Sequence, residues 1–142
     1  MRKQRGFTLI ELLVVIAIIG LLSTLAVVAL NNARQKSRDA KRVSDIKQIQ
    51  TALELYYNDA NAYPATLAFG TGSIAYGDPA VTYMSIVPSN PSPRNDGTCA
   101  NVDYGYSQVS SATYSISYCL GGITGGLAAG PHKATPAGII ND

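Results

Sequence analysis

A nearly unbroken apolar run of 24 residues, Phe7 to Leu30, constrains this chain more than any other feature of its sequence. At 1.5 Å per residue, a helix of that length reaches roughly 36 Å, which exceeds the hydrocarbon core of a bilayer, about 30 Å thick. Glu11 is the single charged residue of the run. The sequence therefore predicts a membrane-spanning helix that carries one carboxylate near its start.

The carboxylate of Glu11 is costly in such a helix. On insertion scales a charged side chain in lipid costs about 2.5 to 3.5 kcal/mol, so a free-standing anchor gains nothing from keeping it. Two interpretations stay open. Either a cation pairs with Glu11 inside the membrane, or Glu11 lies at headgroup depth, because it is only four residues into the run.

The residues before the run indicate its orientation. Arg2, Lys3 and Arg5 place three positive charges there, which by the positive-inside rule hold the N-terminus in the cytoplasm and send the rest of the chain outside. An ordinary secretory signal is the alternative, with residues 27–29 as its cleavage site. The length of the run and the acid within it fit such a signal poorly.

The segment Arg5-Gly6-Phe7-Thr8-Leu9-Ile10-Glu11, followed by apolar residues, resembles the N-terminus of type IV prepilins and type II secretion pseudopilins. The resemblance is strong over residues 1 to about 64 and weak beyond them. In that family a prepilin peptidase cuts after the glycine and methylates the new N-terminus. The resemblance therefore implies a leader over residues 1–6, cleavage between Gly6 and Phe7, and an N-methylated Phe7.

The resemblance also implies a role for Glu11, which in this family is thought to pair with the N-terminal amine of a neighbouring subunit and to set the stagger of a filament. Buried opposite charges attract strongly where the dielectric is low, and an unpaired one is costly. Within a single helix the same pair could also close on itself. The residues alone leave both pairings open.

The function implied is that of a structural subunit, not an enzyme, in a type IV pilus or pilus-like filament. A type II secretion or DNA-uptake pseudopilin is the alternative, and a secreted binding protein with an ordinary signal is a third hypothesis. The expected partners are further copies of the chain in a helical filament, the prepilin peptidase, an inner-membrane platform protein and an assembly ATPase. The expected location is the bacterial cytoplasmic membrane, single-pass, and after assembly an extracellular or periplasmic filament.

The remainder of the chain predicts an α+β fold. Apolar residues at spacings of three and four extend the helix as an exposed amphipathic half over residues 31–63, and Pro64 ends it. Residues 64–142 would form a globular β-containing head with a disulfide loop and a tail. In the family it resembles, a small antiparallel sheet packs on the second half of such a helix, which is the pilin-like architecture expected here.

Two segments of the head alternate like strands, Asp103 to Val109 and Thr113 to Leu120, and predict an antiparallel hairpin with its tyrosines facing the helix. A sugar-binding surface is the alternative interpretation of those tyrosines. Residues 65–98 predict an irregular loop, with Thr82 to Val87 as the best candidate for ordered packing. The tail, Gly121 to Asp142, lacks apolar periodicity and is expected to be a surface flap or partly disordered.

The charges of the chain argue against a nucleic-acid partner. Residues 60–142 contain only Arg94 and Lys133 as cations, which is too few for a phosphate-binding surface. The basic cluster from Arg34 to Arg42 predicts a solvated collar where the helix leaves the membrane, with its aliphatic stems reaching toward headgroups. Binding of this cluster to an anionic surface is the alternative.

Cys99 and Cys119 are the only cysteines, and the topology places both outside the cytoplasm, which favours a disulfide. Closing this loop of 21 residues would stabilise the fold by roughly 3 kcal/mol. No cofactor is expected. Asn95, Asp96 and Asp103 could offer oxygen ligands to calcium, but their spacing matches no compact calcium loop.

Overall fold

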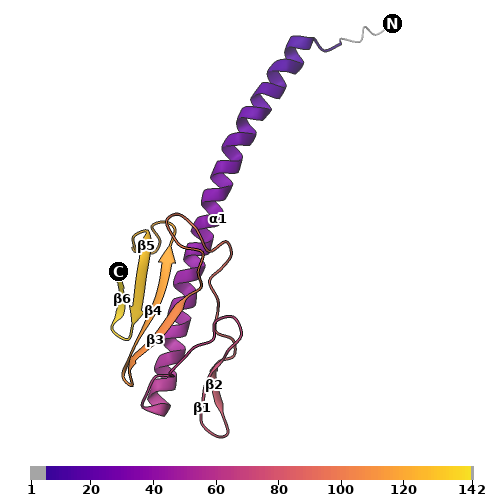
Figure 1. Cartoon of the computed structure of the whole chain (residues 1–142). Helices are drawn as coiled ribbons and strands as arrows, with labels where there is room; N and C mark the ends of the chain where they lie inside the picture. Colours follow the sequence, from indigo (N-terminus) through magenta and orange to yellow (C-terminus); the bar gives the residue numbers. More distant parts are fainter. Residues whose placement is uncertain (1–5, 142) are drawn as a thin grey trace. The chain divides into compact units, whose positions relative to one another are not determined.

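The computed structural model describes residues 6–141, so the predicted leader charges Arg2, Lys3 and Arg5 lie outside the described residues. The chain divides into two compact units, Met1–Arg34 and Gln35–Asp142. One helix, α1 (Leu9–Ala60), contributes its first part to the first unit and its remainder to the second (Figure 1).

Within the first unit, α1 has no packing partner. Every described residue there is exposed, and the most apolar window of the helix has a mean hydropathy of 2.9 with none of it buried. The Ser23 and Thr24 hydroxyls donate to the carbonyls of Ile19 and Leu21, at 2.7 and 2.8 Å. These bonds satisfy the hydroxyls within the helix itself, which suits a lipid environment. The helix is thus long and apolar enough to cross a membrane.

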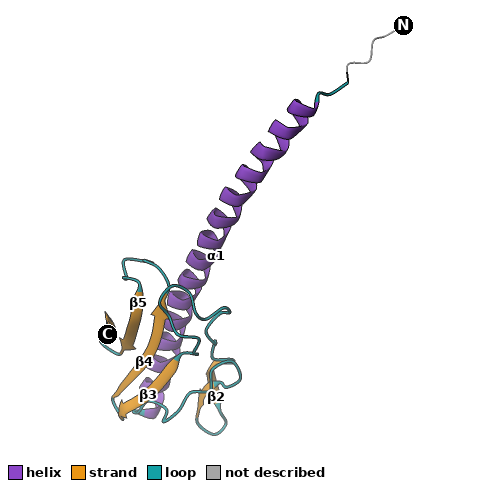
Figure 2. Ribbon diagram, turned by 45° about the horizontal axis from the view of Figure 1, so that its top comes forward, coloured by secondary structure: helices purple, strands orange, loops and turns teal. Residues whose placement is uncertain are grey.

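The second unit combines the remainder of α1 with two antiparallel sheets (Figure 2). The smaller sheet pairs β1 (Ile74–Tyr76) with β2 (Val81–Met84). The larger sheet has the order β3-β4-β5-β6, and its strands are β3 (Gly105–Ser110), β4 (Thr113–Leu120), β5 (Gly130–Thr135) and β6 (Gly138–Asn141). The predicted α+β, pilin-like architecture is therefore confirmed.

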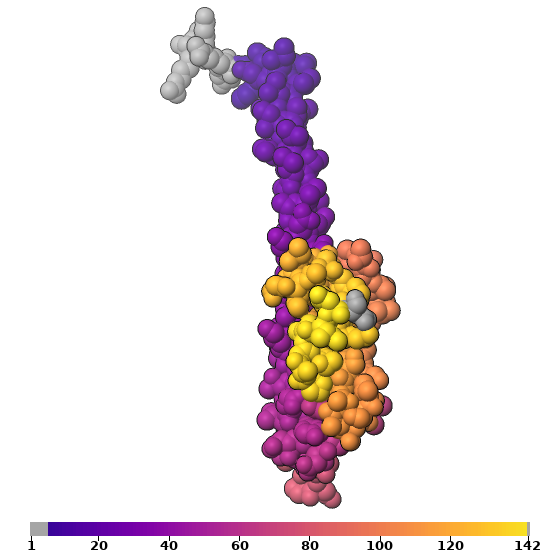
Figure 3. All heavy atoms as spheres, turned by 90° about the vertical axis from the view of Figure 1, so that its left-hand side faces the viewer, coloured from indigo at the N-terminus to yellow at the C-terminus, as the bar shows by residue number. Residues whose placement is uncertain are grey.

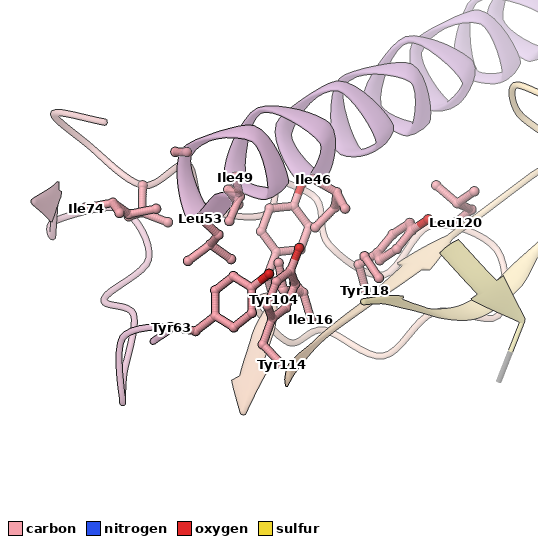
Figure 4. Close-up of a cluster of buried hydrophobic side chains, with 13 residues drawn as sticks. Ile46, Ile49, Leu53, Tyr63, Ile74, Tyr104, Tyr114, Ile116, Tyr118 and Leu120 are labelled. Atoms are coloured by element: carbon pink, nitrogen blue, oxygen red, sulfur yellow. The ribbon is translucent and has the colours of Figure 1, made fainter. Parts of the chain in front are cut away.

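The core lies between α1 and the larger sheet. Ile46, Ile49 and Leu53 of the helix are fully buried. The sheet face that meets them is formed by β4, by the residue before β3 and by Ala134 of β5. Its larger buried side chains are Tyr104, Tyr114, Ile116, Tyr118 and Leu120 (Figure 4). The tyrosines of the predicted hairpin thus face the helix, so the sugar-binding interpretation of these side chains is wrong for the buried ones.

The helix ends where the sequence predicts. Asn61 adopts a positive φ of 54°, and its amide donates to the carbonyl of Tyr57 at 2.8 Å. Asparagine tolerates this left-handed conformation better than most residues, so it closes the last turn. Pro64 follows three residues later.

The expectation for the tail is wrong, because residues 130–141 form two strands of the sheet, β5 and β6 (yellow in Figure 3). β5 does alternate: Gly130, His132 and Ala134 are buried and Pro131 is exposed. Its inward residues are small or polar, so the alternation carries no apolar signal. His132 is covered by Tyr118 of β4, whose ring stacks on it at a centroid distance of 5.4 Å.

Cys99 and Cys119 form a disulfide that joins the loop before β3 to β4. Removing this crosslink is expected to lower the free energy of unfolding by about 3 kcal/mol, because the unfolded chain regains the freedom of the closed loop. Urea denaturation of the full chain in detergent, with the native protein and the Cys99→Ser/Cys119→Ser double variant, measures the difference. A change below about 1 kcal/mol would contradict the expectation, and the double variant should be insensitive to added reductant.

Candidate functional site

The start of α1 carries the residues that the sequence assigns to processing and assembly. Gly6 and Phe7 lie outside regular secondary structure before the helix, and the Phe7 side chain is 87% exposed. Thr8 is the last residue before α1, and its carbonyl accepts from the amide of Leu12 at 3.3 Å. The peptide bond between Gly6 and Phe7 is therefore outside regular structure, where a protease can bind it in extended form.

Glu11 closes a capping box with Thr8. Its Oε2 accepts from both the amide and the hydroxyl of Thr8, each at 2.8 Å. The amide of Glu11 donates to the Thr8 hydroxyl oxygen at 3.2 Å. This reciprocal arrangement satisfies amides that the first helical turn would otherwise leave unpaired.

Thr8 is a site residue that the sequence analysis did not assign, although a Ser or Thr followed three residues later by Glu is a recognised helix-start pattern. Both bonds use one carboxylate oxygen. The second oxygen, Oε1, has no hydrogen-bond partner among the described residues. Glu11 can therefore cap its own helix and still accept a cation from another chain.

Comparison with known proteins addresses this segment directly. Residues 1–27 match the prokaryotic N-terminal methylation motif. The chain has a prepilin-type N-terminus. The predicted resemblance to type IV pilins and type II secretion pseudopilins is thereby confirmed.

Relatives among characterised proteins extend the similarity beyond the prepilin-type segment. The type II secretion system core protein G of Vibrio cholerae is 37% identical over 95 residues, which are 67% of this chain and 58% of that protein. Core protein G of Escherichia coli K12 is 48% identical over 64 residues, 45% of this chain and 44% of that protein. The protein of that name from Pectobacterium carotovorum is 47% identical over 64 residues, 45% and 41% of the two chains.

The chain thus spans about half the length of the curated relatives it matches. No solved structure matches it significantly. All three relatives are type II secretion proteins, so the comparisons favour the pseudopilin alternative over the pilus subunit that was the main expectation.

A second cluster of charged residues lies in the second unit, where the sequence predicted a solvated collar. That prediction is wrong for Arg42 and Arg38. Arg42 is fully buried, and its guanidinium contacts Asp39 at 2.7 Å and Asp96 at 2.9 Å. Arg38 is 21% exposed and donates two hydrogen bonds to Asp96, at 2.8 and 2.5 Å.

The buried charges are satisfied from several directions. Arg42 Nε donates to Asn90 at 2.8 Å, and the carboxylate of Asp39 accepts from the amides of Gly121 and Gly122, at 3.0 and 2.9 Å. Hydrogen bonds from Arg38 are the main cause that lowers the pKa of Asp96, which therefore stays ionised at neutral pH. We call Arg38, Asp39, Arg42, Asn90 and Asp96 the Arg42 network.

The residues considered for calcium have other partners. Asp96 belongs to the Arg42 network. Asp103 accepts from Arg94 at 2.9 Å and from the amide of Asn90 at 2.7 Å, and Asn95 is exposed. Both carboxylates are thus neutralised by guanidinium groups. Among the described residues no group of three or more His, Cys, Asp or Glu side chains is placed to hold a metal ion.

Proposed function

We propose that this chain is a structural subunit of a type II secretion pseudopilus or a closely similar filament. The observation that carries the proposal is the match of residues 1–27 to the N-terminal methylation motif, which includes the fully exposed apolar start of α1. The similarity to core protein G of type II secretion systems supports the pseudopilus over the pilus.

The proposed mechanism begins with insertion of residues 7–30 into the cytoplasmic membrane, with residues 1–6 as a cytoplasmic leader. Prepilin peptidase then cuts between Gly6 and Phe7 and methylates the Phe7 amine. The new amine and the free oxygen of Glu11 are complementary charges that a low-dielectric environment strengthens. Pairing between neighbouring copies neutralises both and aligns the helices in a filament.

The globular unit, proposed as the head over residues 64–142 together with the exposed half of the helix over residues 31–63, would lie on the outer side of the membrane. A platform protein and an assembly ATPase would supply the machinery for extraction. This role is structural, since polymerisation requires complementary surfaces and no catalytic group. The assembled location proposed is a periplasmic or surface filament.

Substitution of Gly6 tests the processing step. A Gly6→Val variant is expected to accumulate as a precursor, because a β-branched side chain crowds the bond that the peptidase must bind. Mass spectrometry of the membrane fraction should find the native protein starting at N-methylated Phe7 and the variant retaining residues 1–6. A native protein that starts near Leu30 would instead indicate an ordinary signal and overturn the proposal.

Deletion of the gene separates the two kinds of filament. A pseudopilus subunit is expected to be needed for release of folded enzymes from the periplasm, so the deletion strain should retain them while any surface pili persist. Restoration of release by the native gene, but not by the Gly6→Val variant, is the control. Loss of surface pili with intact secretion would favour the type IV pilus interpretation.

A further inference from the structure

The loop between β4 and β5 is uncharged and exposes a large apolar side chain. Residues 121–129 contain no Asp, Glu, Lys, Arg or His. Ile123 is 79% exposed, which makes it the most exposed large apolar side chain among the described residues of the second unit. Ala128 and Ala129 are exposed as well. We call residues 121–129 the Ile123 loop.

Buried polar groups hold the Ile123 loop at both of its ends. At its start, the amides of Gly121 and Gly122 donate to the carboxylate of Asp39. Near its end, the Ala128 carbonyl accepts from Nε2 of His132 at 2.9 Å, and the His132 side chain is only 2% exposed. The loop is therefore fixed on the body of the second unit.

The tip of the loop satisfies much of its own backbone. The amide of Thr124 donates to the carbonyl of Leu127 and the amide of Leu127 to the carbonyl of Thr124, each at 3.0 Å. Gly125 and Gly126 make the turn between them, with positive φ angles of 59° and 83°, as a two-residue hairpin turn requires. Few backbone groups at the tip then depend on water, which suits an environment of low polarity.

The ends of the loop place it beside the first residue of the second unit. A Cβ added to Gly122 would lie 3.5 Å from Nε2 of Gln35. Gln35 begins this unit and comes five residues after Leu30, the last residue of the apolar run. The helix α1 is continuous through these residues, so they add a rise of about 8 Å. One headgroup layer of a bilayer is about 5 to 8 Å thick, so Gln35 would lie at its outer edge.

From these observations we infer that the Ile123 loop binds the outer surface of the membrane into which residues 7–30 insert, with the Ile123 side chain among the lipid headgroups. The inference rests on the proposed function, because it requires that insertion. It adds a second lipid contact, made by the globular unit, which each subunit has to release when it leaves the membrane for the filament.

One isoleucine is enough for this contact because the rest of the chain already holds the loop near the membrane. Removal of its exposed apolar surface from water is favourable, and the loop carries no charge that would have to lose its hydration. Attachment through α1 keeps the loop at a high effective concentration near the lipid. Lys36 is exposed next to Gln35, and its flexible stem allows its ammonium group to reach lipid phosphates.

Fluorescence quenching by spin-labelled lipid headgroups tests the contact. The native cysteines are paired with each other, so a fluorophore on the Ala128→Cys variant reports on the loop alone. The full chain is reconstituted in vesicles of phosphatidylethanolamine and phosphatidylglycerol that contain no other protein. Quenching at position 128 is expected to exceed that on the Ala137→Cys variant by about three-fold or more. Equal quenching at the two positions would overturn the inference.

Ala137 is a matched reference for Ala128, because both are exposed alanines in loops that flank β5. The turn that contains Ala137 follows Thr135, whose carbonyl accepts from Gln50 at 2.9 Å. Gln50 comes 15 residues after Gln35, which is about 22 Å further along the helix. A label at 137 is therefore expected to stay in water.

Substitutions of Ile123 give a second readout on the label at 128. Ile123→Asp is expected to lower the quenching to the level seen at 137, because a carboxylate keeps the loop hydrated, and Ile123→Leu should preserve it. Val109→Asp is the control, since it adds the same charge at a 69% exposed valine of β3. Val109 lies beside the start of β4, whereas the loop follows its end. Unchanged quenching in Ile123→Asp would contradict the lipid contact.

Two further outcomes separate this inference from the proposed function. A label at 128 that is shielded from water only in assembled filaments would show that the loop contacts a neighbouring copy, which would overturn the lipid contact and leave the proposed function standing. A native chain that does not float with the vesicles would show that residues 7–30 do not insert, and both would fall. Cleavage after Gly6 and enzyme release are measured separately in cells.

Discussion

Replacing Arg42 with alanine is expected to lower the free energy of unfolding by about 3 to 5 kcal/mol. The reason is electrostatic. Asp39 is fully buried and would lose the guanidinium that neutralises it, and Asp96, which is 7% exposed, would keep only Arg38 as its cation. Asn90 would also lose its donor. Urea denaturation of the full chain in detergent, followed by the near-ultraviolet circular dichroism of the tyrosines, measures the change.

Arg34 provides the matched control, because it is on the same helix, carries the same charge and is exposed. Arg34→Ala is expected to alter stability by no more than about 0.5 kcal/mol. The loss of stability in Arg42→Lys should lie between those of Arg42→Ala and Arg34→Ala. An ammonium group keeps the charge but cannot reproduce the forked hydrogen bonds of a guanidinium. A loss below about 1 kcal/mol in Arg42→Ala would mean that water or another cation compensates the carboxylates.

Substitution of Glu11 is expected to have the largest effect on assembly. Glu11→Gln should reduce filament yield by about a hundred-fold or more, because the amine of the neighbouring copy would be left unpaired in a low-dielectric environment, a loss of about 3 kcal/mol or more. Glutamine can still close a capping box with Thr8, so the start of the helix is preserved. Electron microscopy and sedimentation of sheared filaments provide the measurement.

Thr8→Val is the complementary control for Glu11, because it removes the capping hydroxyl and keeps the carboxylate. Loss of an N-cap costs about 1 kcal/mol, so filament yield should fall by no more than about five-fold. If Glu11→Gln assembles as well as the native chain, the proposal that Glu11 pairs with the Phe7 amine of a neighbouring copy is wrong. If Thr8→Val is as defective as Glu11→Gln, the capping box accounts for the role of Glu11.

Much of the fold can be predicted because apolar periodicity marks it. The run from Phe7 and the spacing of Ile46, Ile49 and Leu53 predict the helix, and the alternation over residues 113–120 predicts β4. The end of the helix near Pro64 follows from turn chemistry. The pair Cys99 and Cys119, favoured by export, is bonded in the structure.

The position of β5 and the burial of Arg42 could not be predicted, because no local sequence pattern marks them. β5 presents a glycine, a histidine and an alanine to the core, so it shows no apolar alternation and owes its place to pairing with β4. Arg42 is buried because loops some 50 to 80 residues away bring Asn90, Asp96 and Gly121 to it, and a charge run on a helix is ordinarily solvated. The capping box is an exception, because Thr8 and Glu11 at a spacing of three residues are a local signal for the start of a helix.

Gly97 and Gly121 lie so close to each other that the loops containing them do not tolerate insertions. A Cβ at Gly97 would lie 2.4 Å from the carbonyl oxygen of Gly121, and one at Gly121 would lie 2.6 Å from the Cβ of Asp96. Lengthening either loop would pull Asp96 or the amides at 121 and 122 away from the helix and leave buried charge uncompensated. Room for inserted epitopes or reporter sequences is therefore to be sought at the exposed turn between β1 and β2, around residues 77–80.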